Sequence, residues 1–308
     1  MIFDIKKKLK NFFFEFKLKK NNNFLKKKKE KKNRFPISGI YNFDFNYNPK
    51  ISLIVNHFTS TTTLTKSIKN IENYDDDIEI IVINDKFYPN KKLVNSINNS
   101  NHIIINSWDH GEVYGYMRGA NISRATDFLI FSQDDDLLPD TKGWIEACLN
   151  EFNKDEKLGL IGFNGGGIYG KNYECIDIAR KVPHSENMRE YCSWLKFGPF
   201  IIRKNLYKEI NGFKPIGQIS ESSNAVDRLL TLEVILAGYK AMLLKNEETK
   251  KIIRRFERDD GLKKEDLVKL KFRNLSFKDT DEIFNRLYKE KIDMISKDNF
   301  FKNPNNEI

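Results

Sequence analysis

Residues 127–140 read Asp-Phe-Leu-Ile-Phe-Ser-Gln-Asp-Asp-Asp-Leu-Leu-Pro-Asp. The uncharged, mostly apolar run at residues 128–131 is typical of a strand that is buried on both faces of a parallel sheet. Three carboxylates follow closely, Asp134, Asp135 and Asp136. Open α/β sheets bind their ligands at the carboxyl ends of such strands. The stretch therefore predicts an α/β fold with an acidic ligand site.

The three adjacent acids have two interpretations. Like charges repel one another unless something positive lies among them, and a divalent cation with oxygen ligands would meet that need. The alternative is a loop whose aspartates turn the chain and cap the next helix. We favour the cation site, although the cluster by itself does not decide between the two.

Residues 35–49 are predicted to form a linker into the fold, and the predicted domain spans residues 37–245, with alternating strand and helix patterns from residue 51 onward. Such alternation predicts right-handed βαβ units in a doubly wound, mostly parallel sheet flanked by helices. Gly238 is the expected left-handed cap of a helix, and residues 164–167 (Asn-Gly-Gly-Gly) are expected to form a surface turn. The predicted strands span 51–55, 78–83, 102–106, 128–131, 158–163, 197–203 and 239–244, and the predicted helices 61–73, 93–97, 115–124, 143–153, 206–210 and 225–237. Residues 246–308 are expected to form a charged, helical C-terminal extension.

The net charge of +10 belongs to one end of the chain. Residues 1–34 carry 14 lysines and arginines against three acids, whereas the remaining residues carry 39 against 40. A nucleic-acid-binding domain needs its positive footprint on the folded part. The composition therefore predicts no nucleic-acid partner.

Residues 1–36 form a basic tail in which phenylalanine and leucine lie among the lysines. Such an amphipathic segment is typical of peripheral contact with an anionic membrane surface, and the alternative is a solvated, disordered extension. The tail lacks the apolar segment and the cleavage site that a secretory signal would need. No run of about 18 apolar residues, the length that a membrane-spanning helix needs, occurs in the sequence. We expect a cytoplasmic protein that is peripheral on the inner face of the membrane.

The cysteines and histidines predict neither a disulfide framework nor a zinc site. Cys148, Cys175 and Cys192 are odd in number and widely spaced, as in reduced cytosolic proteins. The four histidines form no local ligand pattern and are expected to be structural. They are His57, His102, His110 and His184.

The order of these features resembles the family 2 glycosyltransferases with the GT-A fold, over about residues 50–245. Residues 52–58 (Ser-Leu-Ile-Val-Asn-His-Phe) are similar to the family's opening strand, with Asn56 where proline is usual. Residues 79–85 (Glu-Ile-Ile-Val-Ile-Asn-Asp) resemble the strand that ends beside the nucleotide base, although Lys86-Phe87 replaces the usual Gly-Ser. The resemblance implies a nucleotide-sugar donor, a Rossmann-like donor half and an acceptor half.

The resemblance assigns donor binding to the end of the second strand and to a later arginine. Asn84 and Asp85 end the strand, and a carboxylate there accepts hydrogen bonds from the base or the ribose; a turn-forming aspartate is the alternative. Arg118 occupies the position of the family's arginine ahead of the carboxylate strand. It would contact the donor or hold the acidic loop, and a surface salt bridge is the alternative.

The family's Asp-x-Asp motif fits this chain in two registers. Counted back from Pro139, it falls on Gln133 and Asp135, with glutamine in place of the first acid; counted on the acids, it falls on Asp134 and Asp136. We favour the second register, with Asp134 and Asp135 at the donor, all three aspartates at the metal, and Asp135 or Asp136 as its direct ligand. The resemblance implies Mn²⁺ or Mg²⁺, which would neutralise the charge on the leaving nucleotide.

Asp227 is the predicted catalytic residue. It lies eleven positions before Gly238, at the start of an otherwise apolar helix, and matches the general base of the family's Glu-Asp helix. Val226 replaces the first acid of that motif, and Glu233 replaces the usual arginine. The alternative is an ordinary N-terminal aspartate that is favoured by the helix dipole.

The acceptor side is expected at residues 197–213, which look like the family's acceptor strand and the turn after it. Trp194, just ahead, is predicted to stack on an acceptor sugar, and a core position is the alternative. The family often has a late histidine near the diphosphate, but no histidine follows His184. The candidate substitutes are Arg254, Arg255 and Arg258.

These features predict a metal-dependent, inverting, hexosyltransferase-like enzyme. It would move a sugar, expected to be UDP-linked, to a hydroxyl of a glycan or lipid-linked acceptor in surface polysaccharide or glycolipid assembly. One rival is a catalytically degenerate GT-A fold that binds a glycan or a partner protein, and the departures from the family motifs favour it. Another is a nucleotidyltransferase, which would release pyrophosphate instead of a nucleoside diphosphate.

Overall fold

A computed structural model of the protein describes residues 47–58, 60–74, 78–85, 93, 102–106, 111–169, 173, 175–178, 186–214, 223–254 and 277–297. The chain divides into two compact units, residues 1–39 and 40–308, and every described residue lies in the second unit. The predicted basic tail and its membrane contact lie outside the described residues. Within the described part of the chain, no helix combines the length and apolar character needed to cross a membrane.

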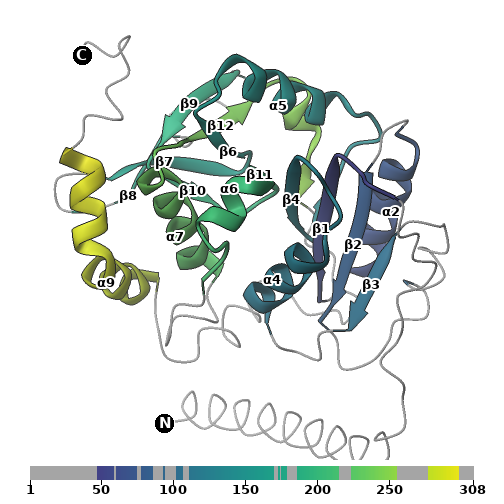
Figure 1. Ribbon diagram of the computed structural model, residues 1–308, viewed down its shortest axis with the longest axis horizontal. Coiled ribbons are helices and arrows are strands. Elements are labelled where there is room, and N and C mark those ends of the chain that lie inside the picture. The colour runs from purple at the N-terminus through teal and green to yellow at the C-terminus, as the bar shows by residue number, and fades with distance from the viewer. Residues whose placement is uncertain are drawn as a thin grey trace, which may run out of the picture. The chain divides into compact units, whose positions relative to one another are not determined.

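An eight-stranded sheet forms the centre of the second unit (Figure 1). Its strand order is β3-β2-β1-β4-β11-β6-β12-β9, and β11 and β9 run opposite to the other strands. This arrangement confirms the predicted mostly parallel α/β sheet. The strands are β1 (Ile51–His57), β2 (Ile78–Asn84), β3 (Ile103–Asn106), β4 (Phe128–Gln133), β6 (Leu158–Gly162), β9 (Met188–Cys192), β11 (Phe200–Arg203) and β12 (Lys240–Lys245).

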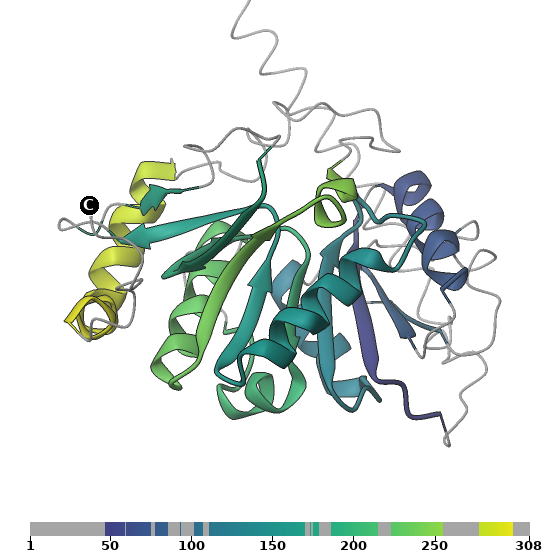
Figure 2. The same ribbon diagram turned by 90° about the horizontal axis from the view of Figure 1, so that it is seen from above.

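Helices cover both faces of this sheet (Figure 2). Alternate strand residues point to opposite faces, so Ile54 joins the core under one set of helices while Leu53 and Val55 join the other. Because both faces are covered, β1 and β2 are buried along their whole length. The first face carries α4 (Glu112–Ile122), α6 (Lys204–Glu209) and α7 (Ser223–Leu236), and the second α2 (Thr61–Glu72) and α5 (Gly143–Lys154).

Most predicted elements lie within a few residues of the observed ones, and one helix end is explained by its glycine. Helix α7 ends at Leu236, and Gly238 follows with a φ of +83°. Its N–H donates to Ile235 O, and the next N–H donates to Val234 O. The predicted left-handed cap is confirmed. Of the predicted helix at residues 93–97, only Leu93 lies among the described residues.

The expected turn at the triple glycine is wrong. Gly165, Gly166 and Gly167 begin strand β7 (Gly165–Tyr169), the central strand of a three-stranded sheet with β8 (Cys175–Asp177) and β10 (Trp194–Lys196). A Cβ on Gly167 would lie 1.7 Å from Ile176 O of β8. The glycines let neighbouring backbones approach closely, and a strand of this kind has no apolar pattern to reveal it.

The C-terminal extension is only partly helical. A short 3-10 turn, η3 (Thr249–Lys251), leads into the two-residue strand β13 (Ile253–Arg254), which pairs antiparallel with β5 (Asp136–Leu137). Helix α9 (Phe277–Lys297) then packs on α7 through Phe284, Ile292 and Ile295. The prediction of a helix is confirmed for α9. It is wrong for β13, which lies directly beside the acidic stretch.

Candidate active site

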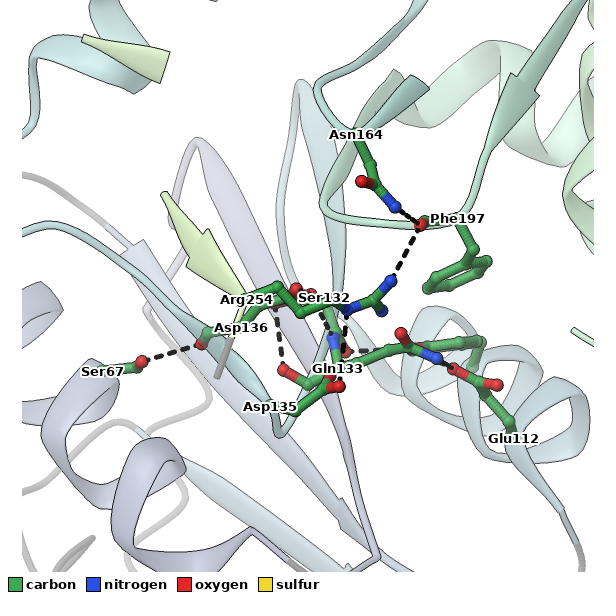
Figure 3. Close-up of polar contacts among 10 residues, drawn as sticks. Ser67, Glu112, Ser132, Gln133, Asp135, Asp136, Asn164, Phe197 and Arg254 are labelled. Atoms are coloured by element: carbon green, nitrogen blue, oxygen red, sulfur yellow. Dashed lines mark hydrogen bonds and ion pairs between the residues drawn. The ribbon is translucent and has the colours of Figure 1, made fainter. Parts of the chain in front are cut away.

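The candidate site lies at the edge of the sheet where the parallel strands end. Strand β4 ends at Gln133, and Asn164 follows the end of β6. Strand β11 runs in the opposite direction, so the segment before it, which contains Phe197, lies at the same edge. Figure 3 shows Gln133, Asn164 and Phe197 around Arg254. Topology thus gathers residues that are far apart in the sequence.

Asp134 holds the loop that follows β1. Its Oδ2 accepts hydrogen bonds from the backbone N–H groups of Phe58 (2.8 Å) and Ser60 (2.7 Å). The same oxygen lies 2.9 Å from His57 Nδ1, and the residue is buried. Since one oxygen of Asp134 has partners at the end of β1 and in the loop after it, this carboxylate serves first as a loop anchor.

Asp136 closes the turn between β4 and β5. Its Oδ2 accepts from the backbone N–H of Gln133 (3.0 Å) and from the Ser132 hydroxyl (3.3 Å). Its Oδ1 lies 3.5 Å from Arg254 Nε. Burial raises the pKa of Asp136, although Arg254 and these hydrogen bonds oppose the rise.

Asp135 is the aspartate with an open oxygen. Its Oδ2 lies 3.4 Å from Arg254 Nε, whereas Oδ1 is buried and has no hydrogen-bond partner among the described residues. Burial raises the pKa of Asp135 to about 7; Arg254 opposes this rise, and the charges of Asp136 and Asp134 add to it. Burying a carboxylate oxygen without a partner costs free energy of folding unless a ligand binds to that oxygen.

Arg254 is the cation at the centre of the site (Figure 3). It projects from β13, and its Nη1 donates to the carbonyl of Phe197 (3.4 Å) while its Nε faces Asp135 and Asp136. Burial lowers the pKa of Arg254, but the two carboxylates outweigh burial and raise it. The guanidinium therefore stays charged. Of the three arginines that the sequence offered, Arg255 and Arg258 lie outside the described residues.

Asp227 binds the backbone N–H of the same residue, Phe197, whose carbonyl Arg254 contacts. Its Oδ2 accepts the N–H of Phe197 at 2.6 Å, and its Oδ1 accepts the N–H of Arg228 at 2.7 Å. The side chain is fully buried, and burial raises its pKa to about 8. The two N–H donors and the Arg228 charge oppose this rise, whereas the charge of Glu112 adds to it. The backbone of one residue thus links Asp227 to Arg254.

Glu112, at the start of α4, is a site residue that the sequence did not reveal. Its Oε1 accepts from Gln133 Nε2 (2.5 Å) and lies 3.0 Å from the Tyr116 hydroxyl. The apolar pattern placed the start of this helix at residue 115, so Glu112 fell in a presumed loop. The available signal was Gly111, which has a φ of +89° and directly precedes the helix.

The predicted donor residues at the end of β2 lie at the same sheet edge. Asn84 Nδ2 donates to Asn106 Oδ1 of β3 (2.7 Å), and Asp85 Oδ2 accepts the N–H of Gly111 (3.0 Å). Both residues are buried. Asp85 therefore connects the end of β2 to the start of α4, and Asn84 connects the ends of β2 and β3 through one hydrogen bond between side-chain amides.

The other two predicted site residues are less central. Arg118 lies on α4 and is partly buried. Trp194 is buried on β10, and its indole N–H donates to Ile168 O (3.2 Å). These surroundings fit the structural alternative for Trp194, and its role at the acceptor stays a prediction.

The three aspartates do not converge as one set of ligands. Among the described residues, no group of three or more His, Cys, Asp or Glu side chains is arranged to hold a metal ion. Asp134 points to the β1–α2 loop and Asp136 is bonded within its own turn, whereas Asp135 keeps a free, buried oxygen. A cation would therefore fit at Asp135, with the rest of its ligands from a bound substrate or water.

The mostly parallel sheet, with acids at its carboxyl edge and a buried aspartate on the Phe197 backbone, matches the GT-A class of fold. The family model "Glycosyl transferase family 2" matches residues 52–208, just over half of the chain, and the protein belongs to this family.

Similarity to individual proteins is more distant. The crystal structure of GalNAc-T7 with UDP, GalNAc and Mn²⁺ resembles the chain with a TM-score of 0.48 at 11% sequence identity. The match covers 70% of this chain and 45% of that one, so the chain spans less than half the length of that protein. A sequence comparison with curated proteins finds no match.

Proposed function

We propose that the protein is an inverting glycosyltransferase that moves a sugar from a nucleotide-sugar, expected to be UDP-linked, to a hydroxyl of a glycan or lipid-linked acceptor. Family membership supports the transferase class. The observation that carries the mechanism is the backbone of Phe197, whose carbonyl accepts from Arg254 and whose N–H donates to Asp227. A cation for the leaving group and a base for the acceptor thus both bind the backbone of one residue.

Donor binding is assigned to the carboxyl edge of β2 and β4. Asn84 and Asp85 present amide and carboxylate groups that suit the base and ribose, and Arg254 suits the diphosphate. Asp134 acts indirectly, because it fixes the β1–α2 loop at the same edge. Arg118 remains a candidate for the donor from its place on α4.

Mn²⁺ or Mg²⁺ is proposed as a cofactor, which the free oxygen of Asp135 would hold. When bound, such a cation would neutralise charge on the leaving diphosphate. Arg254 supplies positive charge at the same carboxylates. The diphosphate would therefore enter a site in which one cationic side chain is already in place.

Asp227 is proposed as the general base. As the acceptor oxygen bonds to the anomeric carbon, the bond from that carbon to the diphosphate breaks, and the acceptor proton passes to a carboxylate oxygen of Asp227. A single displacement of this kind inverts the anomeric configuration. A positioned base contributes roughly 10²–10⁴ in rate, so Asp227→Asn should lower kcat by a factor in that range.

A thermal-shift panel of UDP-, GDP-, dTDP- and CMP-sugars, each with Mn²⁺ or EDTA, tests the proposed function. A ligand that binds only the folded state raises its stability by RT ln(1 + [L]/Kd). We expect one nucleotide class to raise the Tm, and to raise it further with Mn²⁺. Absence of any shift across the panel would contradict donor binding.

A second candidate, a degenerate fold that binds a glycan or partner protein, is favoured by one observation. Asp134 and Asp136 are both engaged within the protein, and Asp227 is fully buried. This candidate predicts a thermal shift with oligosaccharides but no release of nucleoside diphosphate from any nucleotide-sugar. Measured release from one donor would exclude it.

We also propose that residues 1–34 place the enzyme on the cytoplasmic face of an anionic membrane. Their 14 basic residues and interspersed phenylalanines support this proposal. An acceptor linked to lipid, in surface polysaccharide or glycolipid assembly, would then be presented at the same surface.

A further inference from the structure

Glu112 presents one open carboxylate oxygen at the edge of the site. Oε1 is held by Gln133 and by the Tyr116 hydroxyl. No donor among the described residues reaches Oε2. The residue is only partly buried, so this oxygen is not sealed inside the protein. A carboxylate with one fixed oxygen and one open oxygen is set up to accept a hydrogen bond from a ligand.

One of the two groups that hold Glu112, Tyr116, is fixed by packing in the core. Tyr116 is buried, and its hydroxyl also lies 2.9 Å from Ser132 O. Its ring stacks on Phe197 and Phe213 and packs edge-on against Phe131. Because the Tyr116 ring cannot move without disturbing this cluster, the Glu112 carboxylate is pre-organised, which is what a specific contact requires.

The carboxylate lies between the two halves of the site. Gln133, its partner, is two residues from Asp135, and Tyr116 stacks at 5.3 Å on Phe197, whose N–H binds Asp227. The charge of Glu112 acts on both aspartates and raises the pKa of each. In the displacement proposed above, the transferred sugar lies between the leaving diphosphate near Asp135 and the base Asp227.

We infer that Glu112 is a specificity-determining residue, whose Oε2 accepts a hydrogen bond from a hydroxyl of the transferred sugar. This inference rests on the proposed function. It names the substrate class more closely: a neutral sugar with a free hydroxyl at that point. A uronic acid would bring a second carboxylate to the acids already there, and like charges repel.

The test compares Kd values for a nucleoside diphosphate and its sugar conjugate by isothermal titration calorimetry. The probes are UDP with UDP-glucose, or GDP with GDP-mannose, as the donor panel selects. The variants are Glu112→Ala and the milder Glu112→Gln, which keeps an acceptor oxygen if the first folds poorly. Glu146→Ala on α5, an exposed glutamate on the opposite face of the sheet, is the matched control.

We expect Glu112→Ala to raise the Kd of the sugar conjugate by about tenfold or more, since a hydrogen bond to a charged group is lost. The nucleoside diphosphate alone should bind within about twofold of wild type, and Glu112→Gln should show a smaller loss and a weaker discrimination against UDP-glucuronic acid. Equal weakening of both probes would show a merely structural role and overturn the inference, as would no change in either. Failure of the wild type to bind any probe would instead contradict the proposed function itself.

Discussion

At the scale of single residues, three adjacent aspartates that look alike in the sequence have different roles in the structure. Asp134 stabilises a loop, Asp136 closes a turn, and Asp135 retains a buried oxygen without a partner among the described residues. The adjacent letters gave no means of telling them apart, because each role depends on groups from elsewhere in the fold. The donors to Asp134 follow β1, and the cation beside Asp135 comes from β13.

Asp134→Asn should therefore lower stability. The amide oxygen of asparagine is an uncharged and weaker acceptor, so His57 and two buried backbone N–H groups lose a charged acceptor. We expect a loss of about 2 kcal/mol in the free energy of unfolding, measured by urea denaturation at pH 7. Asp140→Asn, at an exposed position, is the control. An unchanged midpoint in the Asp134 variant would refute the anchoring role.

The pH dependence of activity should report on Asp227. Its pKa is raised to about 8, and only the ionised form accepts a proton. The value of kcat/KM should thus rise with pH up to about 8, falling about tenfold per unit below it. Because the Glu112 charge raises this pKa, Glu112→Gln should move the rise to lower pH. A profile that stays flat from pH 6 to 9 would argue against Asp227 as the base.

At the scale of elements, regular patterns were predictable and short contacts were not. Continuous apolar runs identified β1, β2 and β4, and helical spacing identified α2 and α5. The strands β5 and β13 have only two residues each, too few for any periodicity, yet their pairing brings Arg254 to the acids. Sequence alone offered Arg254 only as one of three candidates.

Substitutions of two glycines in β7 test how closely this strand packs against β8. In Gly167→Ala, the new Cβ would meet the backbone oxygen of Ile176 at 1.7 Å, whereas in Gly165→Ala its nearest neighbour would be Lys196 at 3.6 Å. We expect Gly167→Ala to cost about 1–3 kcal/mol or more in stability. Gly165→Ala should change stability by only about 0.5 kcal/mol. Similar thermal denaturation curves for the two variants would mean that β7 and β8 do not pack as described.

At the scale of the whole molecule, charge is divided between the tail and the rest of the chain. The residues after position 34 are nearly neutral, so attraction to an anionic surface should depend on residues 1–34. We expect the full chain to sediment with vesicles that contain phosphatidylserine, and deletion of residues 1–34 to abolish this at 0.15 M salt. Equal sedimentation of both forms would refute the membrane proposal and leave the transferase proposal intact.

Asp135 is the aspartate that we propose to complete the donor site. The most direct measurement is the Kd of the selected nucleotide-sugar, with Mn²⁺ and with EDTA, for the wild type and for Asp135→Asn. We predict that Mn²⁺ tightens binding to the wild type and has no effect on the variant, while the variant keeps its fold by circular dichroism. If Asp135→Asn retains the full Mn²⁺-dependent gain in affinity, the assignment of Asp135 is wrong.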